Sequence, residues 1–583
     1  MIAMRNGPGC IQAIVIVVVL LFVAGLGGDT LKAMVGPWAQ NALHLAIVAG
    51  LAWLIVRPRS REIDWKIQVG AGVGLLAALF VALWFFGPAA TIGPKGERIA
   101  SAWGIVSAIV GLGVVWGFHA MLFGGPDPVD GLLGSARFGG KEDVDALANN
   151  SGDLIVGRSG DGKLLRYDGP AHLLTIAPTR SGKGVGTLIP NLLTANRSII
   201  CIDPKGENAR VTGRQRETFG PVYYLDPFDL CGRRGAGTAY NPLARLNPFG
   251  LDLAEDAMTL ADALVFDLSD AGDPHWNEEA KALLAGIILY TVCHGEPHVR
   301  TLGTVRDYLT IAPDDFRKLL GDMQASGEAR GLIARSANRF LSKSDREAAG
   351  VLSAAQRHTH FLDSPRITAT TDRSDFSFAS LKDQVATVFL ILPPDRLDTY
   401  SRWLRLLLAQ ALTEMARSEA QPARPVLFLL DEFAALGRLQ AIERAMGLMA
   451  GYGLQLWPIL QDIHQLRGHY SERAGTFISN AGVLQAFGVN DFETADMLSR
   501  TMGKTTIRYE TTGTSEKTAW YEERSRTAST SEHVAARNLM DPNEIMKLEP
   551  RDMLLMMVGK DPLILRKIRY FEEREFAGLH DPA

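Results

Sequence analysis

The sequence has few cysteines, and their spacing forms no metal-binding or disulfide pattern. Only four occur among 583 residues, at Cys10, Cys201, Cys231 and Cys293, far apart and never as a CxxC pair. Structural zinc sites and disulfide frameworks are built from closely spaced or regularly paired cysteines, so both are excluded as organising features. A reducing compartment is the simplest location for the bulk of the chain.

The sequence also lacks a charge excess of either sign. Lys plus Arg number 60 and Asp plus Glu number 64, which gives a formal net charge of −4. Proteins that bind nucleic acid through their overall charge are basic, so any contact with nucleic acid must be local. Tandem repeats of solenoid period are absent too, which excludes the repeat architectures.

Apolar residues are abundant, and the excess lies at the beginning of the chain. Hydrophobic residues make up 47% of the sequence and the mean hydropathy is +0.05, which is high for a soluble protein. Four apolar stretches each approach or exceed the roughly 18 residues that cross a bilayer. A cleaved signal peptide explains only the first, so residues 1–125 are predicted to form a transmembrane region of about four helices. The stretches cover about residues 11–28, 38–56, 67–93 and 99–125.

Basic residues in the short loops predict the orientation of these spans. The second loop carries Arg57, Arg59, Arg61 and Lys66, whereas the first and third loops carry few basic residues. Because positively charged loops stay in the cytoplasm, that loop and the N-terminus are expected there. After four crossings the remainder of the chain is expected in the cytoplasm as well.

Beyond the apolar stretches, short buried-strand patterns alternate with helical patterns, which is typical of an α/β fold with a parallel sheet. A long region from about 254 to 366 has helical periodicity instead. Residues 505–531, rich in Thr, Ser, Glu and Arg, are interpreted as a mobile loop or excursion. The predicted strands lie at about 173–177, 198–202, 222–225, 385–392, 426–430 and 454–460, with a terminal hairpin at 553–558 and 563–565.

The strongest local motif follows the first predicted strand and reads APTRSGKG, residues 177–184. A phosphate-binding loop needs small residues that turn backbone N–H groups inward, a lysine, and a helix N-terminus that faces the anion. All three are present, although Ala177 replaces the usual first glycine and Gly184 replaces the Ser or Thr that binds Mg²⁺. The alternative is a glycine-rich connection with an exposed lysine. The predicted ATP-binding residues are Thr179, Arg180, Ser181, Gly182, Lys183, Gly184 and Val185.

Two further strand ends carry residues suited to nucleotide hydrolysis. The run 426–430 is followed by Asp431 and Glu432, one carboxylate for Mg²⁺ and the next for the attacking water. The run 454–460 is followed by Gln461, whose amide can sense or position the γ-phosphate or that water. Taken singly, the acidic pair can be a helix cap and Gln461 a surface residue. At three strand ends in this order, they predict an ATPase with the catalytic residues Lys183, Asp431, Glu432 and Gln461.

Together these segments resemble the type IV secretion coupling proteins of the TraG type, within the larger group of FtsK- and HerA-like ring motors. The resemblance covers about residues 130–570 and is specific as a set. Gly184 is similar to that family's own variant of the loop. The segments that carry it are PTRSGKGVG (178–186), LIPNLL (188–193), DPKGE (203–207), YNPL (240–243), DPHWNEEA (273–280), LLDEFAALG (429–437), AGYG (450–453) and LQDIHQL (460–466).

The resemblance implies a RecA-like P-loop domain with an inserted all-α domain, preceded by the transmembrane region. It implies that Lys183 binds phosphate, that Asp431 holds Mg²⁺ directly or through water, that Glu432 polarises the hydrolytic water, and that Gln461 senses the γ-phosphate. Thr187 and Ser181 are the two candidates for the hydroxyl group that would bind Mg²⁺ in place of the usual Ser or Thr. Thr187 lies a turn too far along the helix, and Ser181 is the other candidate. The expected domains are 1–125 (membrane), 126–253 and 371–583 (nucleotide-binding), and 254–370 (inserted helices).

The resemblance also implies a ring, expected to be a hexamer, in which an arginine from the neighbouring subunit stabilises transition-state charge. The choice among the available arginines stays open. The candidates are Arg438, Arg444, Arg467, Arg473 and Arg500.

Three other motifs have two interpretations each. In DPKGE, Lys205 or Glu207 lies near the nucleotide or a subunit interface, or the segment is only a tight turn. Trp276 either forms part of a surface that recognises cargo or, more simply, anchors a helix in the core. The basic clusters 210–216 and 233–234 line a DNA channel or are solvated faces.

The function expected from these features is that of an ATPase of the bacterial inner membrane that couples DNA or nucleoprotein to a type IV secretion channel. Its partners would be single-stranded or double-stranded DNA with relaxase-type cargo, the channel proteins, and copies of itself; its cofactors would be ATP and Mg²⁺. Family members commonly have two spans, so four are a departure. The alternatives are a coupling ATPase for protein effectors and a scaffold that binds nucleotide without hydrolysing it.

Overall fold

The computed structural model describes residues 131–232, 237–266, 274–517 and 525–582. Apart from Gly131 and Leu132, they belong to one compact unit that begins at Leu133. The four predicted membrane spans lie outside the described residues. In the part of the chain that is described, no helix has both the length and the apolar character that a membrane crossing needs.

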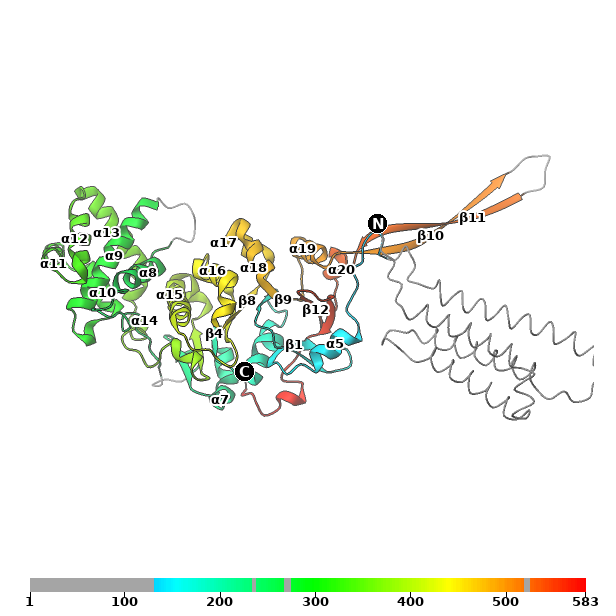
Figure 1. Ribbon diagram of the computed structural model, residues 1–583, viewed down its shortest axis with the longest axis horizontal. Coiled ribbons are helices and arrows are strands. Elements are labelled where there is room, and N and C mark those ends of the chain that lie inside the picture. Colours follow the sequence, from blue (N-terminus) through cyan, green and yellow to red (C-terminus); the bar gives the residue numbers. More distant parts are fainter. Residues whose placement is uncertain (1–130, 233–236, 267–273, 518–524, 583) are drawn as a thin grey trace, which may run out of the picture. The chain divides into compact units, whose positions relative to one another are not determined.

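A mixed sheet of eleven strands organises the described part of the chain (Figure 1). Seven neighbouring strands are parallel, and nearly all their side chains are buried, as expected for a parallel sheet covered on both faces. In spatial order these strands are β9 (Ala481–Ala486), β3 (His172–Ile176), β8 (Leu454–Leu460), β7 (Val426–Leu430), β4 (Ile199–Asp203), β6 (Thr387–Ile391) and β5 (Val222–Leu225).

Antiparallel strands extend the sheet beyond β9. The predicted terminal hairpin is confirmed: β12 pairs antiparallel with both β9 and β13. The N-terminal hairpin then joins β13 through a bridge between Arg158 and Arg566. These strands are β12 (Asp552–Met557), β13 (Leu563–Arg566), β1 (Leu154–Arg158) and β2 (Leu164–Tyr167).

Every regular element that the structure describes between Leu253 and Thr368 is helical, and these helices pack on one another (Figure 1, green). Trp276 anchors this packing, since a Cβ added at Gly350 would lie 2.4 Å from its ring. The core interpretation of Trp276 is therefore confirmed. The helices are α8 (Leu253–Leu264), α9 (Pro274–His294), α10 (Leu302–Thr310), α11 (Pro313–Ala325), α12 (Leu332–Leu341), α13 (Asp345–Thr359) and α14 (Pro365–Thr368).

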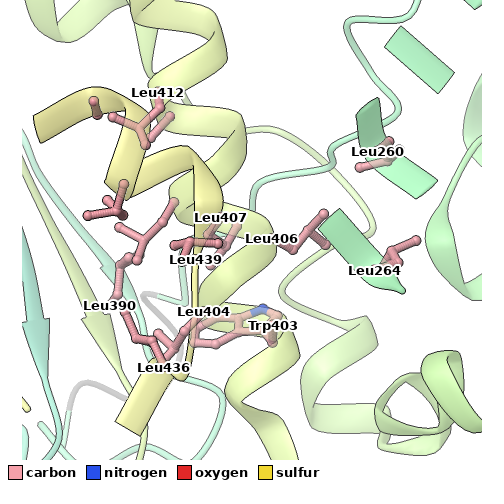
Figure 2. Packing of buried hydrophobic residues seen from close by; sticks show 14 of the residues in the cluster. Leu260, Leu264, Leu390, Trp403, Leu404, Leu406, Leu407, Leu412, Leu436 and Leu439 are labelled. Carbon is pink, nitrogen blue, oxygen red and sulfur yellow. The ribbon is translucent and has the colours of Figure 1, made fainter. Parts of the chain in front are cut away.

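Helix α15 (Leu397–Arg417) connects the helical region to the sheet. Its side chains Trp403 and Leu406 are fully buried in one cluster with Leu264 of α8 and Leu390 of β6 (Figure 2). Leu436, which follows β7, belongs to the same cluster. A continuous apolar core thus reaches from the inserted helices to the segment behind the Asp431-Glu432 pair.

The helix expected after the glycine-rich loop is divided into two parts. A π-helical turn, η1 (Gly184–Leu188), precedes α6 (Ile189–Thr194), and the N–H of Ile189 donates to the carbonyl oxygen of Gly184. Pro190 has no N–H to donate to Gly186, which removes one regular i→i−4 bond at this point. Such π turns occur often at functional sites.

Of the mobile loop or excursion predicted at 505–531, the loop is wrong for the residues described. They form a two-stranded antiparallel ribbon of β10 (Lys504–Lys517) and β11 (Ser525–Asn538), paired from Lys504↔Asn538 to Lys517↔Ser525 (Figure 1, orange). The Thr-rich composition that suggested a polar loop also favours extended strands. At its base, the N–H of Ala136 donates to the carbonyl oxygen of Lys504 (2.9 Å).

Candidate nucleotide-binding site

The glycine-rich loop lies at the carboxyl end of β3, which is the middle strand of the eleven-stranded mixed sheet and the second of its seven parallel strands. Arg180 and Gly182 both have left-handed backbone conformations, with φ of 64° and 93°. A Cβ added at Gly182 or Gly184 would meet no other atom within 4 Å, so the space in front of the loop is open. Ala177 continues the strand by donating its N–H to Leu460 (2.8 Å), and its φ is not positive, so its backbone conformation does not require glycine.

The structure brings the predicted catalytic residues together at this edge of the sheet. The ammonium of Lys183 lies 2.5 Å from Oε1 of Glu432 and 3.5 Å from Oδ1 of Asp431. Nε2 of Gln461 donates to the other carboxylate oxygen of Glu432 (2.9 Å). The hydroxyl of Thr179 donates to Oε1 of Gln461 (3.1 Å), which closes a chain of polar contacts around the loop.

This convergence follows from the strand order. β8 lies between β3 and β7, so Gln461 follows the strand between the loop and the acidic pair. Glu432 itself has φ of 49°, a strained conformation for a residue other than glycine. Its backbone N–H donates to Oδ1 of Asp431 (3.0 Å), and both carboxylates face the ammonium of Lys183 from adjacent positions.

The two carboxylates differ in their protonation behaviour. Burial raises the pKa of Asp431, and the charge of Lys183 offsets burial only in part. Burial also acts to raise the pKa of Glu432, but the hydrogen bond and charge of Lys183 outweigh it, so this pKa lies below its usual range. Glu432 is therefore ionised at neutral pH, as a group that accepts a proton must be.

The donors beside the loop fit Mg²⁺. This ion is usually held by one or two carboxylates together with phosphate oxygens and water, and Asp431 supplies a carboxylate beside the open space. Thr187 is 2% exposed and lies away from that space, whereas the Ser181 hydroxyl is half-buried and donates to Pro178 (2.6 Å). Within the described residues, no group of three or more His, Cys, Asp or Glu could hold a metal without such outside ligands.

The DPKGE segment forms the tight turn of one interpretation, and the place of Lys205 or Glu207 near the nucleotide or a subunit interface stays a prediction. Asp203 is buried at the end of β4 and accepts from the N–H of Ala209 (2.8 Å), so it stabilises the turn into α7 (Glu207–Glu217). Burial raises its pKa to about 6, against the effect of several backbone N–H groups. Lys205 is exposed, and its charge adds a small contribution to the lowered pKa of Glu432, after those of Lys183 and Gln461.

Two arginines of the first basic cluster, Arg214 and Arg216, make contacts within the fold. Arg216 is fully buried and donates to the backbone carbonyls of Ala195 and Arg197, and burial lowers its pKa to about 9. Arg214 pairs with Asp581 (2.7 Å). The DNA-channel interpretation is therefore wrong for Arg216, while residues 233–234 lie outside the described residues.

Most of the candidate transition-state arginines form ion pairs within their own chain. Arg438 and Arg473 both contact Glu443, at 3.7 and 2.5 Å. Arg467 contacts Glu493 (2.8 Å), and Arg500 contacts Asp496 (2.9 Å).

The sequence patterns missed one residue at the loop. Lys567, which follows β13, donates from its ammonium to the backbone carbonyl of Ser181 (2.8 Å). No spacing rule connects a lysine near the C-terminus with this loop, so only the fold reveals the contact.

A parallel α/β sheet with a phosphate-binding loop, a carboxylate pair and a glutamine at three strand ends defines the class of P-loop nucleotide-binding proteins. Residues 138–581 match the family described as type IV secretory system conjugative DNA transfer, and the chain belongs to that family.

Named relatives agree with this assignment. The chain is 28% identical over 503 residues to a conjugal transfer protein TraG of Escherichia coli, covering 76% of this chain and 77% of that protein. It is 31% identical over 429 residues to a VirD4 protein of Rhizobium radiobacter, covering 70% and 58%. The plasmid coupling protein TrwB, solved with the ATP analogue ADPNP, has the same fold at a TM-score of 0.57 and 18% identity, over 74% of this chain and 93% of that one.

Proposed function

We propose that this protein is a Mg²⁺-dependent ATPase that couples DNA or nucleoprotein to a type IV secretion channel and drives its transfer. The observation that carries the proposal is the convergence of Lys183, Asp431, Glu432 and Gln461 on an open phosphate-binding loop. Membership of the conjugative DNA transfer family supports the cargo, and TrwB, which has been solved with ADP and Mg²⁺, supports the cofactors.

The contacts suggest how the residues act. Lys183 pairs with Glu432, and a nucleotide phosphate at the loop would compete for the same ammonium. Release of Lys183 removes the interaction that lowers the pKa of Glu432, which makes this carboxylate a stronger base toward water. Gln461 keeps its hydrogen bond to Glu432 and so orients the carboxylate. Mg²⁺, held through Asp431 and the phosphates, would neutralise charge that develops on the leaving oxygens.

The assembly and location are part of the proposal. The four apolar stretches would place the chain in a bacterial inner membrane with the ATPase domain in the cytoplasm. A homo-hexamer would let one of the candidate arginines reach the neighbouring site. DNA would be held through its phosphates, with relaxase-type cargo and channel proteins as partners, because a pump needs no base-specific contacts. The net charge of −4 favours one second candidate, a coupling ATPase for protein effectors.

The test is ATP hydrolysis by the full-length protein in detergent, with and without single-stranded or double-stranded DNA across a salt series. Lys183→Ala and Glu432→Gln are compared with Lys560→Ala, an exposed lysine in the β12–β13 turn. DNA-stimulated, salt-sensitive turnover that is lost in the first two variants and kept in the third supports the proposal. Turnover indifferent to DNA favours protein cargo, and absence of turnover with intact nucleotide binding supports the scaffold alternative.

A further inference from the structure

The segment after β13 lies directly against the glycine-rich loop and the helix that follows it. The carbonyl oxygen of Ile568 is so close to Gly186 that an added Cβ would lie 3.1 Å from it. Farther along, Tyr570 and Phe576 are buried in one apolar cluster with Ile189 of α6. The C-terminal segment is therefore part of the wall that supports the loop.

Within this segment, Lys567 makes the contact that reaches the loop itself. Its Nζ donates to the carbonyl oxygen of Ser181 at 2.8 Å. Its own N–H donates to the carbonyl oxygen of Arg551 (2.8 Å), which ties its backbone to the residue before β12. The ammonium also lies 5.1 Å from the ring centroid of Phe487, which is 1% exposed. The lysine thus has a fixed base and a buried aromatic neighbour.

The contact determines the orientation of one peptide group. In a trans peptide the C=O and the following N–H point in opposite directions. Lys567 holds the C=O of Ser181 on the side of the C-terminal segment, so the N–H of Gly182 points to the other side. Gly182, with φ of 93°, permits this orientation and leaves open space beside it. The other face of Ser181 rests on Gly488, where an added Cβ would lie 2.9 Å from the Ser181 Cβ.

The positive charge of Lys567 is not neutralised by a close partner. Among the described residues, no carboxylate lies within ion-pair distance of its ammonium; Asp552, the acid near it, pairs instead with Arg566 (3.7 Å). A neutral hydrogen-bond donor would suffice to hold a carbonyl. A cation beside a phosphate-binding loop also contributes a favourable potential for a phosphate anion.

We propose that Lys567 is a positioning residue of the nucleotide site, which holds the Ser181–Gly182 peptide so that the Gly182 N–H faces the phosphates and adds a second positive charge behind the loop. This inference rests on the proposed function, because it assumes that the loop binds nucleotide phosphate.

The test compares Lys567→Met, Lys567→Arg and the control Lys560→Met in the full-length protein. Lys560 is exposed in the turn of the same hairpin and remote from the loop. The Kd for Mg·ADP and for Mg·ATP, the kcat and KM of hydrolysis, and amide hydrogen exchange of the peptide 177–188 are measured. Methionine keeps the apolar stem and removes the donor and the charge.

Lys567→Met is expected to raise Kd for both nucleotides about tenfold, which corresponds to the loss of one charge-assisted hydrogen bond. KM should rise more than kcat falls, exchange within 177–188 should accelerate, and the Kd difference from the wild type should shrink at high salt. Arginine should restore part of the affinity because it can donate to the same carbonyl. Lys560→Met should leave all these values unchanged.

Unchanged Kd in Lys567→Met, or equal changes in Lys567→Met and Lys560→Met, would overturn the inference while leaving the proposed function intact. A lower unfolding temperature with wild-type Kd in the folded fraction would also overturn it, since it would show a role in stability alone. If the wild-type protein binds neither nucleotide, the proposed function fails and the inference fails with it.

Discussion

Two clusters of charged side chains lie at opposite edges of the parallel sheet. The carboxyl-edge cluster comprises Lys183, Asp431, Glu432 and Gln461. The amino-edge cluster comprises Asp153, Arg197, Arg424 and Gln455, gathered near the starts of β1, β4, β7 and β8. Both contain a cation against a carboxylate and a glutamine amide, so they differ in surroundings rather than in chemistry.

The amino-edge cluster is closed. The side chains of Arg197 and Asp153 are 3% and 6% exposed, and Arg197 donates to both oxygens of Asp153. Arg197 also donates to Oε1 of Gln455 (2.6 Å), whose amide donates in turn to the carbonyl oxygens of Gly169 and Ala171. Every polar group in this chain of contacts has a protein partner, so a ligand would have nothing to bind.

The carboxyl-edge cluster is open. The side chain of Glu432 is 29% exposed and that of Lys183 is 13% exposed, beside a loop whose glycines face free space. Lys183 can therefore exchange one anionic partner for another without leaving a charge unpaired in the core. Accessibility and a replaceable partner therefore distinguish the functional ion pair from the structural one.

The largest effect is expected when Glu432, the proposed proton acceptor of the carboxyl-edge cluster, is replaced. Glu432→Gln should lower kcat by about 10²–10⁴-fold, because the amide cannot accept a proton from water. Nucleotide Kd should stay the same or fall, since Lys183 and the loop remain and the carboxylate that competes for Lys183 loses its charge. Steady-state hydrolysis and nucleotide titration on the same preparation provide the measurement, and Glu472→Gln, an exposed glutamate in η9 (Ser471–Arg473), is the control. A variant that retains wild-type kcat would show that another group is the base.

Breaking the closed cluster should cost stability instead. Arg197→Met leaves Asp153 buried with less compensation, which should lower the free energy of unfolding by about 3–5 kcal/mol. Arg424→Met removes a more exposed partner of Asp153 and should cost about 1 kcal/mol or less. Denaturant unfolding measures both, and KM for ATP of the folded variants should stay at the wild-type value. Equal costs for the two arginines would contradict the view that burial sets the difference.

The two clusters also differ in how far they could be predicted. The carboxyl-edge residues follow from local rules: a glycine-rich turn opens a helix, and polar residues end buried strands that share one edge. Asp153 and Arg197 precede strands in the same way, but nothing in their spacing indicates that they meet, since β1 joins the sheet only through a bridge to β13. Lys567 was missed for the same reason. Long-range pairing is decided by the fold.

The remaining errors have physical causes of their own. The ribbon β10–β11 was interpreted as a loop because its Thr and Ser residues are polar, although Thr is also among the residues enriched in strands. The basic cluster containing Arg216 was interpreted as exposed because charges usually are, yet its guanidinium is buried among backbone carbonyls. In both cases the hydrogen bonds to backbone groups decided the structure, and the polarity of the side chains did not predict it.

A smaller effect is expected on the pH dependence of stability, which Asp203 at the end of β4 should influence. Its pKa is raised to about 6 in the folded protein, so the folded state holds a proton that the unfolded state releases at about 3.8. Stability should therefore fall as pH rises from about 4 to 6, by at most about 3 kcal/mol. Asp203→Asn stays neutral, so its unfolding temperature relative to the wild type should increase over that range. Asp383→Asn, at an exposed position, should show a constant difference. A constant difference for Asp203→Asn as well would contradict the raised pKa.

The smallest effect concerns the orientation of one amide in the open cluster. The Thr179 hydroxyl donates to Oε1 of Gln461, which leaves Nε2 to donate to Glu432. Without the hydroxyl, the amide can turn its oxygen toward the carboxylate, where the two repel. Thr179→Val should therefore lower kcat about fivefold with little change in KM, which corresponds to a hydrogen bond worth about 1 kcal/mol. Thr179→Ser keeps the hydroxyl and should retain activity. If Thr179→Val and Thr179→Ser have the same kcat, the hydrogen bond from Thr179 does not orient Gln461, and the shape of the side chain at this position matters more.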